Sequence, residues 1–169
     1  MAAETLRPNA AGTYTSLSKN GGSANYDRVM EAVADEDSTY VYTGGASLFD
    51  TYNLPAHSAG SGTINSVTVY FRCRKTDVGD TNARAHIQTH STPYEGAQKS
   101  LTTSWVTYSE TWTTNPNTGA AWTWDEIDAL EIGVRMGVGE QPPCRCTQVY
   151  VEVEYSAASS YSQHIMLWG

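Results

Sequence analysis

The sequence is poor in basic side chains, in apolar runs and in cysteine, and each shortage excludes a class of protein. Ten Lys and Arg against eighteen Asp and Glu give a net charge of -8, which opposes non-specific binding to nucleic acid or to anionic lipid. No window reaches the length of a membrane span, and the first residues lack the charged and apolar regions of a secretory signal. We therefore expect no nucleic acid and no membrane as partners, and folding in a cytoplasm.

Cysteine is too scarce for a disulfide framework. Cys73, Cys144 and Cys146 are odd in number, and the last two are separated by one residue, whereas zinc knuckles typically separate paired cysteines by roughly two to four. Free thiols are favoured over a disulfide or a metal site, and we predict no cofactor.

Catalytic motifs are also missing, because the sequence contains no GxSxG, CGSC or HExxH. A glycosidase needs two placed carboxylates, which could come from a group of acidic residues in the second half of the chain. These are Glu110, Asp125, Glu126 and Asp128. Because a helix start explains Asp125 and Glu126 more simply, we predict that the protein is not an enzyme and has no catalytic residue.

Two groups of candidate metal ligands have simpler explanations. The acidic run at 35–37 has hard oxygen ligands without the spacing of an EF-hand, which favours a solvated acidic turn. His86 and His90 lie on one predicted strand, roughly 13 Å apart along the same outward face, which is too far for a shared metal. We predict that both are surface histidines, as are His57 and His164, and that the chain has no metal site.

The abundant residues are those of strands, with eleven Tyr against two Phe and many Thr, Ser and Val. Apolar residues alternate with polar ones in several segments separated by Gly and Pro. The alternation predicts strands near residues 12–17, 38–43, 46–55, 63–75, 83–90, 105–113, 130–136 and 145–155. The expected fold is all-β, an antiparallel two-sheet β-sandwich of jelly-roll type, with an immunoglobulin-like sandwich as the alternative.

One short helix is predicted near 123–129. Thr123 and Glu126 match a capping box, and Asp125 adds negative charge to the first turn. Trp122 and Trp124 beside it are interpreted as packing anchors. After Tyr155 the composition changes to a small polar spacer and a short apolar end, which divides the chain into a sandwich domain at 1–155 and a C-terminal arm at 156–169.

Tryptophan and tyrosine offer the best candidate ligand surface, because the faces of sugar rings pack on aromatic rings. Burial in the core is the more common fate of any single Trp. Tyr70, Trp112 and Tyr150 are the predicted members of a glycan platform, the two tyrosines because they are expected on outward strand positions.

Four segments resemble small jelly-roll-like virion structural proteins of tailed phages and prophages. They are EAVADEDSTYVYT, DTYNLP followed by INSVTVYFRCR, WVTYSETWTTNPNTGAAWTWDEIDALEIGVRM and RCTQVYVEVEY, within residues 26–155. The resemblance implies a capsid decoration protein, a minor capsid protein or a tail appendage, located in the virion, and it carries over no catalytic residue.

The leading hypothesis from the sequence is therefore a capsid decoration or minor capsid protein that binds the assembled shell as a homo-oligomer, with a trimer favoured. Its partners would be the major capsid protein or other virion subunits. The arm would supply the contact, because short exposed apolar segments often mark interfaces. The contact residues are Ile165, Met166, Leu167 and Trp168. The alternative hypothesis is a carbohydrate-binding module on a phage tail or virion surface.

Overall fold

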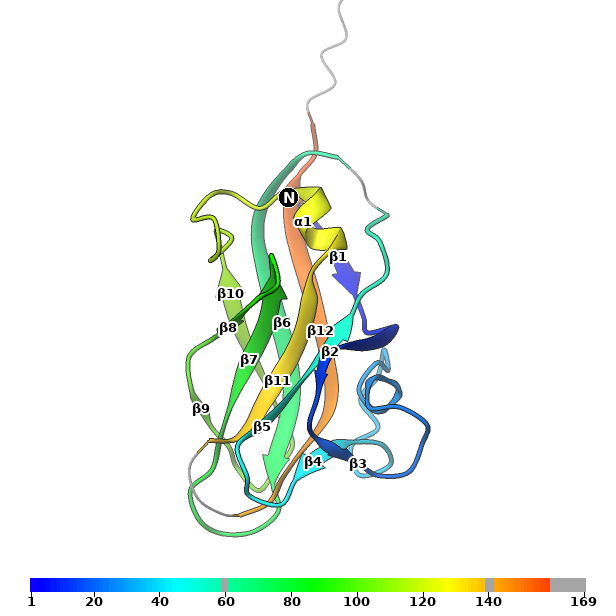
Figure 1. Ribbon diagram of the computed structural model, residues 1–169, viewed down its shortest axis with the longest axis vertical. Helices are drawn as coiled ribbons and strands as arrows, with labels where there is room; N and C mark the ends of the chain where they lie inside the picture. The colour runs from blue at the N-terminus through cyan, green and yellow to red at the C-terminus, as the bar shows by residue number, and fades with distance from the viewer. Residues whose placement is uncertain (59–60, 139–141, 159–169) are drawn as a thin grey trace, which may run out of the picture.

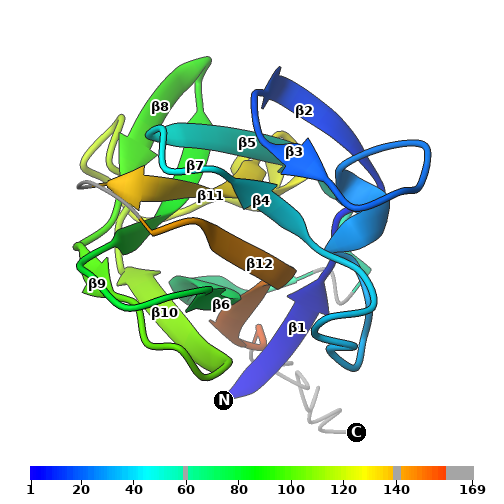
Figure 2. The same ribbon diagram turned by 90° about the horizontal axis from the view of Figure 1, so that it is seen from below.

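Two antiparallel sheets packed face to face make up nearly all of the computed structural model, which describes residues 1–58, 61–138 and 142–158 (Figure 1). Figure 2 shows the two layers, with β5, β7 and β11 in one and β6 and β12 in the other. The predicted all-β, two-sheet sandwich is confirmed.

Each sheet has six strands within the described residues. Sheet A has the order β10 (Val106–Trp112), β6 (Thr63–Lys75), β12 (Cys144–Ser156), β4 (Val41–Thr43) and β3 (Ser18–Lys19), and β1 (Ala2–Leu6) also pairs with β12. Sheet B has the order β2 (Ala10–Thr15), β5 (Leu48–Asn53), β11 (Glu131–Val138), β7 (Asn82–Thr89) and β8 (Thr92–Glu95), and β9 (Lys99–Ser100) pairs with β7. The sequence did not indicate the short edge strands β1, β8 and β9, which have little apolar alternation.

The core lies between the sheets and follows the predicted alternation. Val67, Val69 and Phe71 of β6 lie opposite three valines of β12 and are fully buried. Sheet B faces them with Ala85 and Ile87 of β7 and with the apolar side of β11. The buried residues of β11 are Ile132, Val134 and Met136. All three cysteines are free thiols buried in the same core.

Helix α1 (Trp124–Asp128) closes one end of the sandwich (Figure 1). The Thr123 hydroxyl accepts a hydrogen bond from the Glu126 backbone N–H at 3.3 Å, and the Glu126 carboxylate accepts one from the Thr123 N–H at 2.9 Å. This is the predicted capping box. Trp122 is 4% exposed and donates to the Trp112 carbonyl, while Trp124 donates to the Gly62 carbonyl. Both tryptophans therefore anchor the helix, as predicted, and the only other helical element described is the 3₁₀ turn η1 (Tyr26–Arg28).

His86 corrects the prediction of a surface histidine. It does point to the outer side of sheet B, but only 1% of its side chain is exposed, because it stacks on Phe49 at 4.5 Å with Tyr14 against its edge at 6.4 Å. The bulge of β2 brings Tyr14 over this face, since residues 12–14 interrupt the ladder with β5 and the Tyr14 N–H donates instead to the Thr51 hydroxyl. Neither ring nitrogen of His86 has a hydrogen-bond partner among the described residues.

The proposed arm is only partly described. Strand β12 ends at Ser156, and the predicted contact residues lie outside the described residues. These are Ile165, Met166, Leu167 and Trp168, and His164 lies outside as well. In the part of the chain that the structure describes, every helix is too short to cross a membrane.

Candidate functional site

Two of the three predicted platform residues do lie together. Tyr70 and Tyr150 are direct partners in the β6–β12 pair, and their rings stack with centroids 4.8 Å apart at an angle of 10°. The Arg7 guanidinium lies 4.8 Å from the centre of the Tyr150 ring. Burial and the nearby Glu152 carboxylate raise the pKa of both tyrosines. Because Tyr150 carries Tyr70 on one face and Arg7 on the other, it has no open ring face for a sugar.

Trp112 does not belong to this surface. In the β6–β10 pair Tyr70 lies opposite Ser109, whereas Trp112 lies opposite Val67, a core residue. Since side chains alternate along a strand, Trp112 is on the inner side of sheet A, where it packs against the core. The prediction that Trp112 shares a platform with the two tyrosines is wrong, because the sequence did not show the register of β10.

A pocket of about 450 Å³ lies instead at the end of the sandwich opposite α1, where β3, β4 and β12 meet. Its walls come from four segments that are distant in the sequence. They are Asn20 after β3, residues 40–44 around β4, Thr76 after β6 and residues 143–145 at the start of β12. The lining residues are Asn20, Tyr40, Tyr42, Gly44, Thr76, Pro143, Cys144 and Arg145.

Two tyrosines give this pocket its aromatic wall. Tyr42 lies opposite Ser18 and Arg145 in sheet A, and its ring meets Tyr40 edge to face with centroids 6.0 Å apart. Tyr42 is 38% exposed, the most exposed aromatic residue of the described chain. Arg145 lies 4.4 Å above the Tyr40 ring. Tyr42 therefore presents aromatic surface to solvent at the pocket, while Arg145 covers Tyr40.

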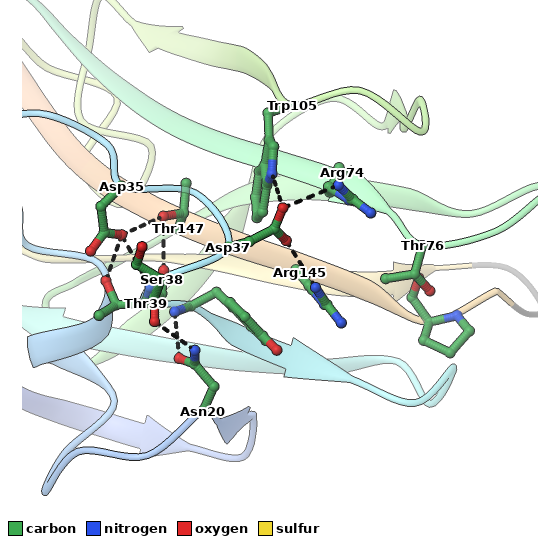
Figure 3. Close-up of polar contacts among 12 residues, drawn as sticks. Asn20, Asp35, Asp37, Ser38, Thr39, Arg74, Thr76, Trp105, Arg145 and Thr147 are labelled. Carbon is green, nitrogen blue, oxygen red and sulfur yellow. Dashed lines mark hydrogen bonds and ion pairs between the residues drawn. The ribbon is translucent and has the colours of Figure 1, made fainter.

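Asn20 holds the backbone that carries these rings. Its side-chain oxygen accepts from the Tyr40 N–H at 2.7 Å, and its side-chain amide donates to the Ser38 carbonyl at 2.8 Å (Figure 3). Its backbone N–H donates to the Tyr40 carbonyl at 3.1 Å. On the other wall, the Thr76 hydroxyl donates to the Pro143 carbonyl at 3.0 Å. The pocket is therefore built on backbone segments that are fixed before any ligand arrives.

The acidic run at 35–37 is an exposed turn, as its composition predicts, but its carboxylates are also paired. Asp37 accepts from Arg145 at 2.9 Å, and its other oxygen lies 3.5 Å from both the Arg74 guanidinium and the Trp105 indole N–H (Figure 3). Asp35 accepts from the Thr39 hydroxyl at 2.7 Å, and Glu36 pairs with Arg72. The turn is held on the outer face of sheet A because that face carries three arginines, which lie far from it in the sequence.

A second, smaller pocket of about 230 Å³ lies beside α1. Its lining includes His90 and Glu126, which are 3.5 Å apart. Glu126 already completes the capping box, and the lining residues include no Trp, Tyr or Phe. The Glu126 carboxylate in this pocket therefore has a structural role, and the pocket has no large aromatic face on which a sugar ring could pack.

Of the carboxylates weighed as glycosidase groups, three lie in α1 and Glu110 lies in β10, and most of them have a partner. Glu110 pairs with Lys99 at 3.1 Å, and Asp128 accepts from the His57 ring at 2.7 Å. Hydrogen bonds from the His57 backbone and ring hold the pKa of Asp128 below its usual value, which does not suit a general acid. Among the described residues, no three His, Cys, Asp or Glu side chains are grouped so as to hold a metal ion.

No protein-family model and no curated protein matches this sequence. Solved structures do match the fold. The C-terminal CBM6 of LamC, a marine laminarinase from Zobellia galactanivorans, is similar with a TM-score of 0.50 and 9% identity, over 90% of this chain and 100% of that one. The xylan-binding module CBM15 is similar with a TM-score of 0.53 and 8% identity, over 93% of this chain and 99% of that one. At these identities the likeness shows the β-sandwich fold.

These comparisons correct the leading functional prediction. The structures that share the sandwich are carbohydrate-binding modules, and neither is a virion protein. The prediction of a capsid decoration or minor capsid protein is therefore contradicted, and a capsid partner and a trimer lose their support with it. Alternating strands are generic, so segments such as RCTQVYVEVEY resemble many sandwich proteins. The alternative prediction, a carbohydrate-binding module, is the one that fits the comparisons.

Proposed function

We propose that this protein is a non-catalytic carbohydrate-binding module and that the pocket beside Tyr42 is its glycan site. The observation that carries the proposal is the exposed Tyr42 ring, which lines the pocket of about 450 Å³ next to a second tyrosine. The faces of sugar rings carry patches of C–H groups that pack on aromatic rings. The sandwich fold shared with known carbohydrate-binding modules supports the same class of function.

The size and chemistry of the pocket suit one or two sugar units. Its volume of about 450 Å³ falls within the usual range for small-molecule sites, roughly 300–1,000 Å³. Polar residues line the pocket together with the two tyrosines, among them Asn20, Thr76 and Arg145. A few placed polar groups next to an apolar surface fix the orientation of a ligand and give specificity.

Binding to soluble polysaccharides, measured by affinity electrophoresis and then by calorimetry, tests the proposal. We expect Tyr42→Ala to weaken binding about tenfold or more, since an aromatic contact is worth on the order of 1 kcal/mol beyond the area it buries. Tyr42→Phe keeps the ring and should bind nearly as well as the native protein. Release of reducing ends from the bound polysaccharide should stay at the level of a protein-free sample.

Tyr150→Ala is the matched control, because Tyr150 is also an outward tyrosine of sheet A but has both ring faces covered. Its binding should equal that of the native protein. The proposal fails if no polysaccharide binds, or if Tyr150→Ala abolishes binding while Tyr42→Ala leaves it intact. The second result would move the site to the stacked tyrosine pair.

A further inference from the structure

The pocket has a local charge that differs from the charge of the whole molecule. The chain carries a net charge of -8, yet the one charged side chain that lines the pocket within the described residues is Arg145. Its side chain is 31% exposed. A pocket built for neutral sugars does not need a guanidinium in its wall, so the position of Arg145 needs an explanation.

Asp37 only partly neutralises this charge. It is shared between two guanidinium groups, with Arg145 at 2.9 Å and Arg74 at 3.5 Å, so it does not fully neutralise either of them (Figure 3). The Asp37 side chain is 56% exposed, which weakens both pairs by solvent screening. Arg145, the member of this cluster that lines the pocket, therefore keeps part of its positive charge at the pocket wall.

Other charged residues near the pocket do not cancel it. Lys75 directly precedes Thr76 and Lys19 directly precedes Asn20, but neither lysine lines the pocket, and the Lys75 ammonium donates to the Gly79 carbonyl. The acidic residues of the following loop, Asp77 and Asp80, are exposed and do not line the pocket. An anion that enters the pocket would therefore meet Arg145 as the charged side chain of its wall.

The Arg145 guanidinium is held in place and still has N–H donors that are not hydrogen-bonded within the described residues. Its guanidinium stacks on the Tyr40 ring at 4.4 Å, and one nitrogen donates to Asp37. Within the described residues this is its one hydrogen bond, and a guanidinium has several further N–H donors in a planar fork. Such a fork matches the two oxygens of a carboxylate or a sulfate, and a group held rigid beforehand loses little entropy on binding.

We infer that the pocket binds an acidic sugar, one that bears a carboxylate or a sulfate group, with Arg145 as the residue that binds the anionic group. The inference rests on the proposed function and adds the class of ligand to it. The sugar ring would pack on Tyr42, and the anionic group would lie against the free edge of the guanidinium. Because the stacking surface and the anion donor are neighbours in one wall, a single sugar unit could contact both.

Three probes test this inference by calorimetry with the full chain: polygalacturonate for the carboxylate, a sulfated galactan for the sulfate, and xylan as a neutral polymer. We expect the native protein to prefer one of the anionic polymers, with an affinity that falls as salt is added. Which of the two binds more tightly identifies the anionic group. Arg145→Gln should weaken that binding about tenfold or more. The affinity of Arg145→Lys should lie between those of the native protein and Arg145→Gln.

Arg72→Gln is the matched control, because Arg72 is a second arginine of sheet A that pairs with the acidic turn but does not line the pocket. It should bind like the native protein, and thermal melts should show that Arg145→Lys folds. Binding of xylan that depends on Tyr42 but not on Arg145 or on salt would overturn the inference and leave the proposed function standing. Binding to none of the three probes would count against both.

Discussion

Asp50 and Asn25 meet inside the sandwich, where the Asn25 side-chain amide donates to the Asp50 carboxylate at 2.6 Å and both residues are buried. Asp50 also accepts from the backbone N–H groups of Ser16 and Leu17 at 2.6 and 2.8 Å, and from the Tyr52 hydroxyl at 3.1 Å. Burial raises the pKa of Asp50, while these hydrogen bonds oppose that rise. One carboxylate thus fastens the chain between β2 and β3 to strand β5.

Asp50→Ala should destabilise the protein by about 3 kcal/mol or more, because it leaves several buried donors without an acceptor. Asp50→Asn keeps the shape and one acceptor oxygen, so its loss should be smaller. Urea unfolding followed by tryptophan fluorescence measures both. The exposed Asp77→Ala serves as the control, and an equal effect of Asp50→Ala and Asp77→Ala would contradict the role given to Asp50.

His86 makes the stability depend on pH in a known direction. Burial lowers its pKa from 6.5 to about 4, with Arg135 adding to the effect and the Glu95 and Glu131 carboxylates opposing it. The unfolded chain therefore binds a proton more readily than the folded one. Stability should fall as the pH is lowered from 6.5 towards 4, by up to about 3 kcal/mol from this residue.

Urea unfolding at several pH values in this range measures the effect, with His86→Gln as the comparison. The variant should show a flatter dependence on pH between 6.5 and 4, even if it is less stable at neutral pH. A variant whose stability changes with pH as steeply as that of the native protein would show that another group causes the change. Such a result would leave the burial of His86 without an energetic consequence.

The sequence predicts those parts of the fold that depend on local pattern. Strict alternation in β6, β11 and β12 identifies the buried residues, and the Thr123–Glu126 pair identifies the start of α1. These signals lie within a few residues of each other, so no knowledge of the topology is needed. The fold class follows from the number of such strands and the turns between them.

The candidate site is less predictable, because its residues meet only through the topology. Tyr42 and Arg145 are direct partners across the β4–β12 pair, and Asp37 reaches Arg74 and Arg145 from a separate loop. No spacing in the sequence links these residues. The sequence favours Tyr70 and Tyr150 and does not single out Tyr42, and only the structure shows that the Tyr70 ring is stacked while Tyr42 is exposed.

The buried thiols should be inert in the folded protein. Burial raises the pKa of Cys73 well above its usual value and that of Cys144 to about 11, and a thiol reacts as its thiolate. Ellman's reagent should therefore find almost no reactive thiol in the native protein at mildly alkaline pH and three per chain in concentrated guanidinium chloride. Fast native labelling would mean that the core opens readily, and fewer than three thiols after unfolding would indicate a disulfide.

Asp37→Asn separates the structural role of the acidic turn from its effect on ligand charge. The loss of stability should be at most about 1 kcal/mol, because the Asp37 side chain is 56% exposed and exposed ion pairs contribute little. Binding of the preferred anionic polymer should become tighter, since a negative charge beside Arg145 is removed while the stack on Tyr40 still holds the guanidinium. Xylan is the neutral control and should show no such gain. Weaker binding of the anionic polymer would mean that Asp37 is needed to orient Arg145, and a similar gain for both polymers would show that charge is not the cause.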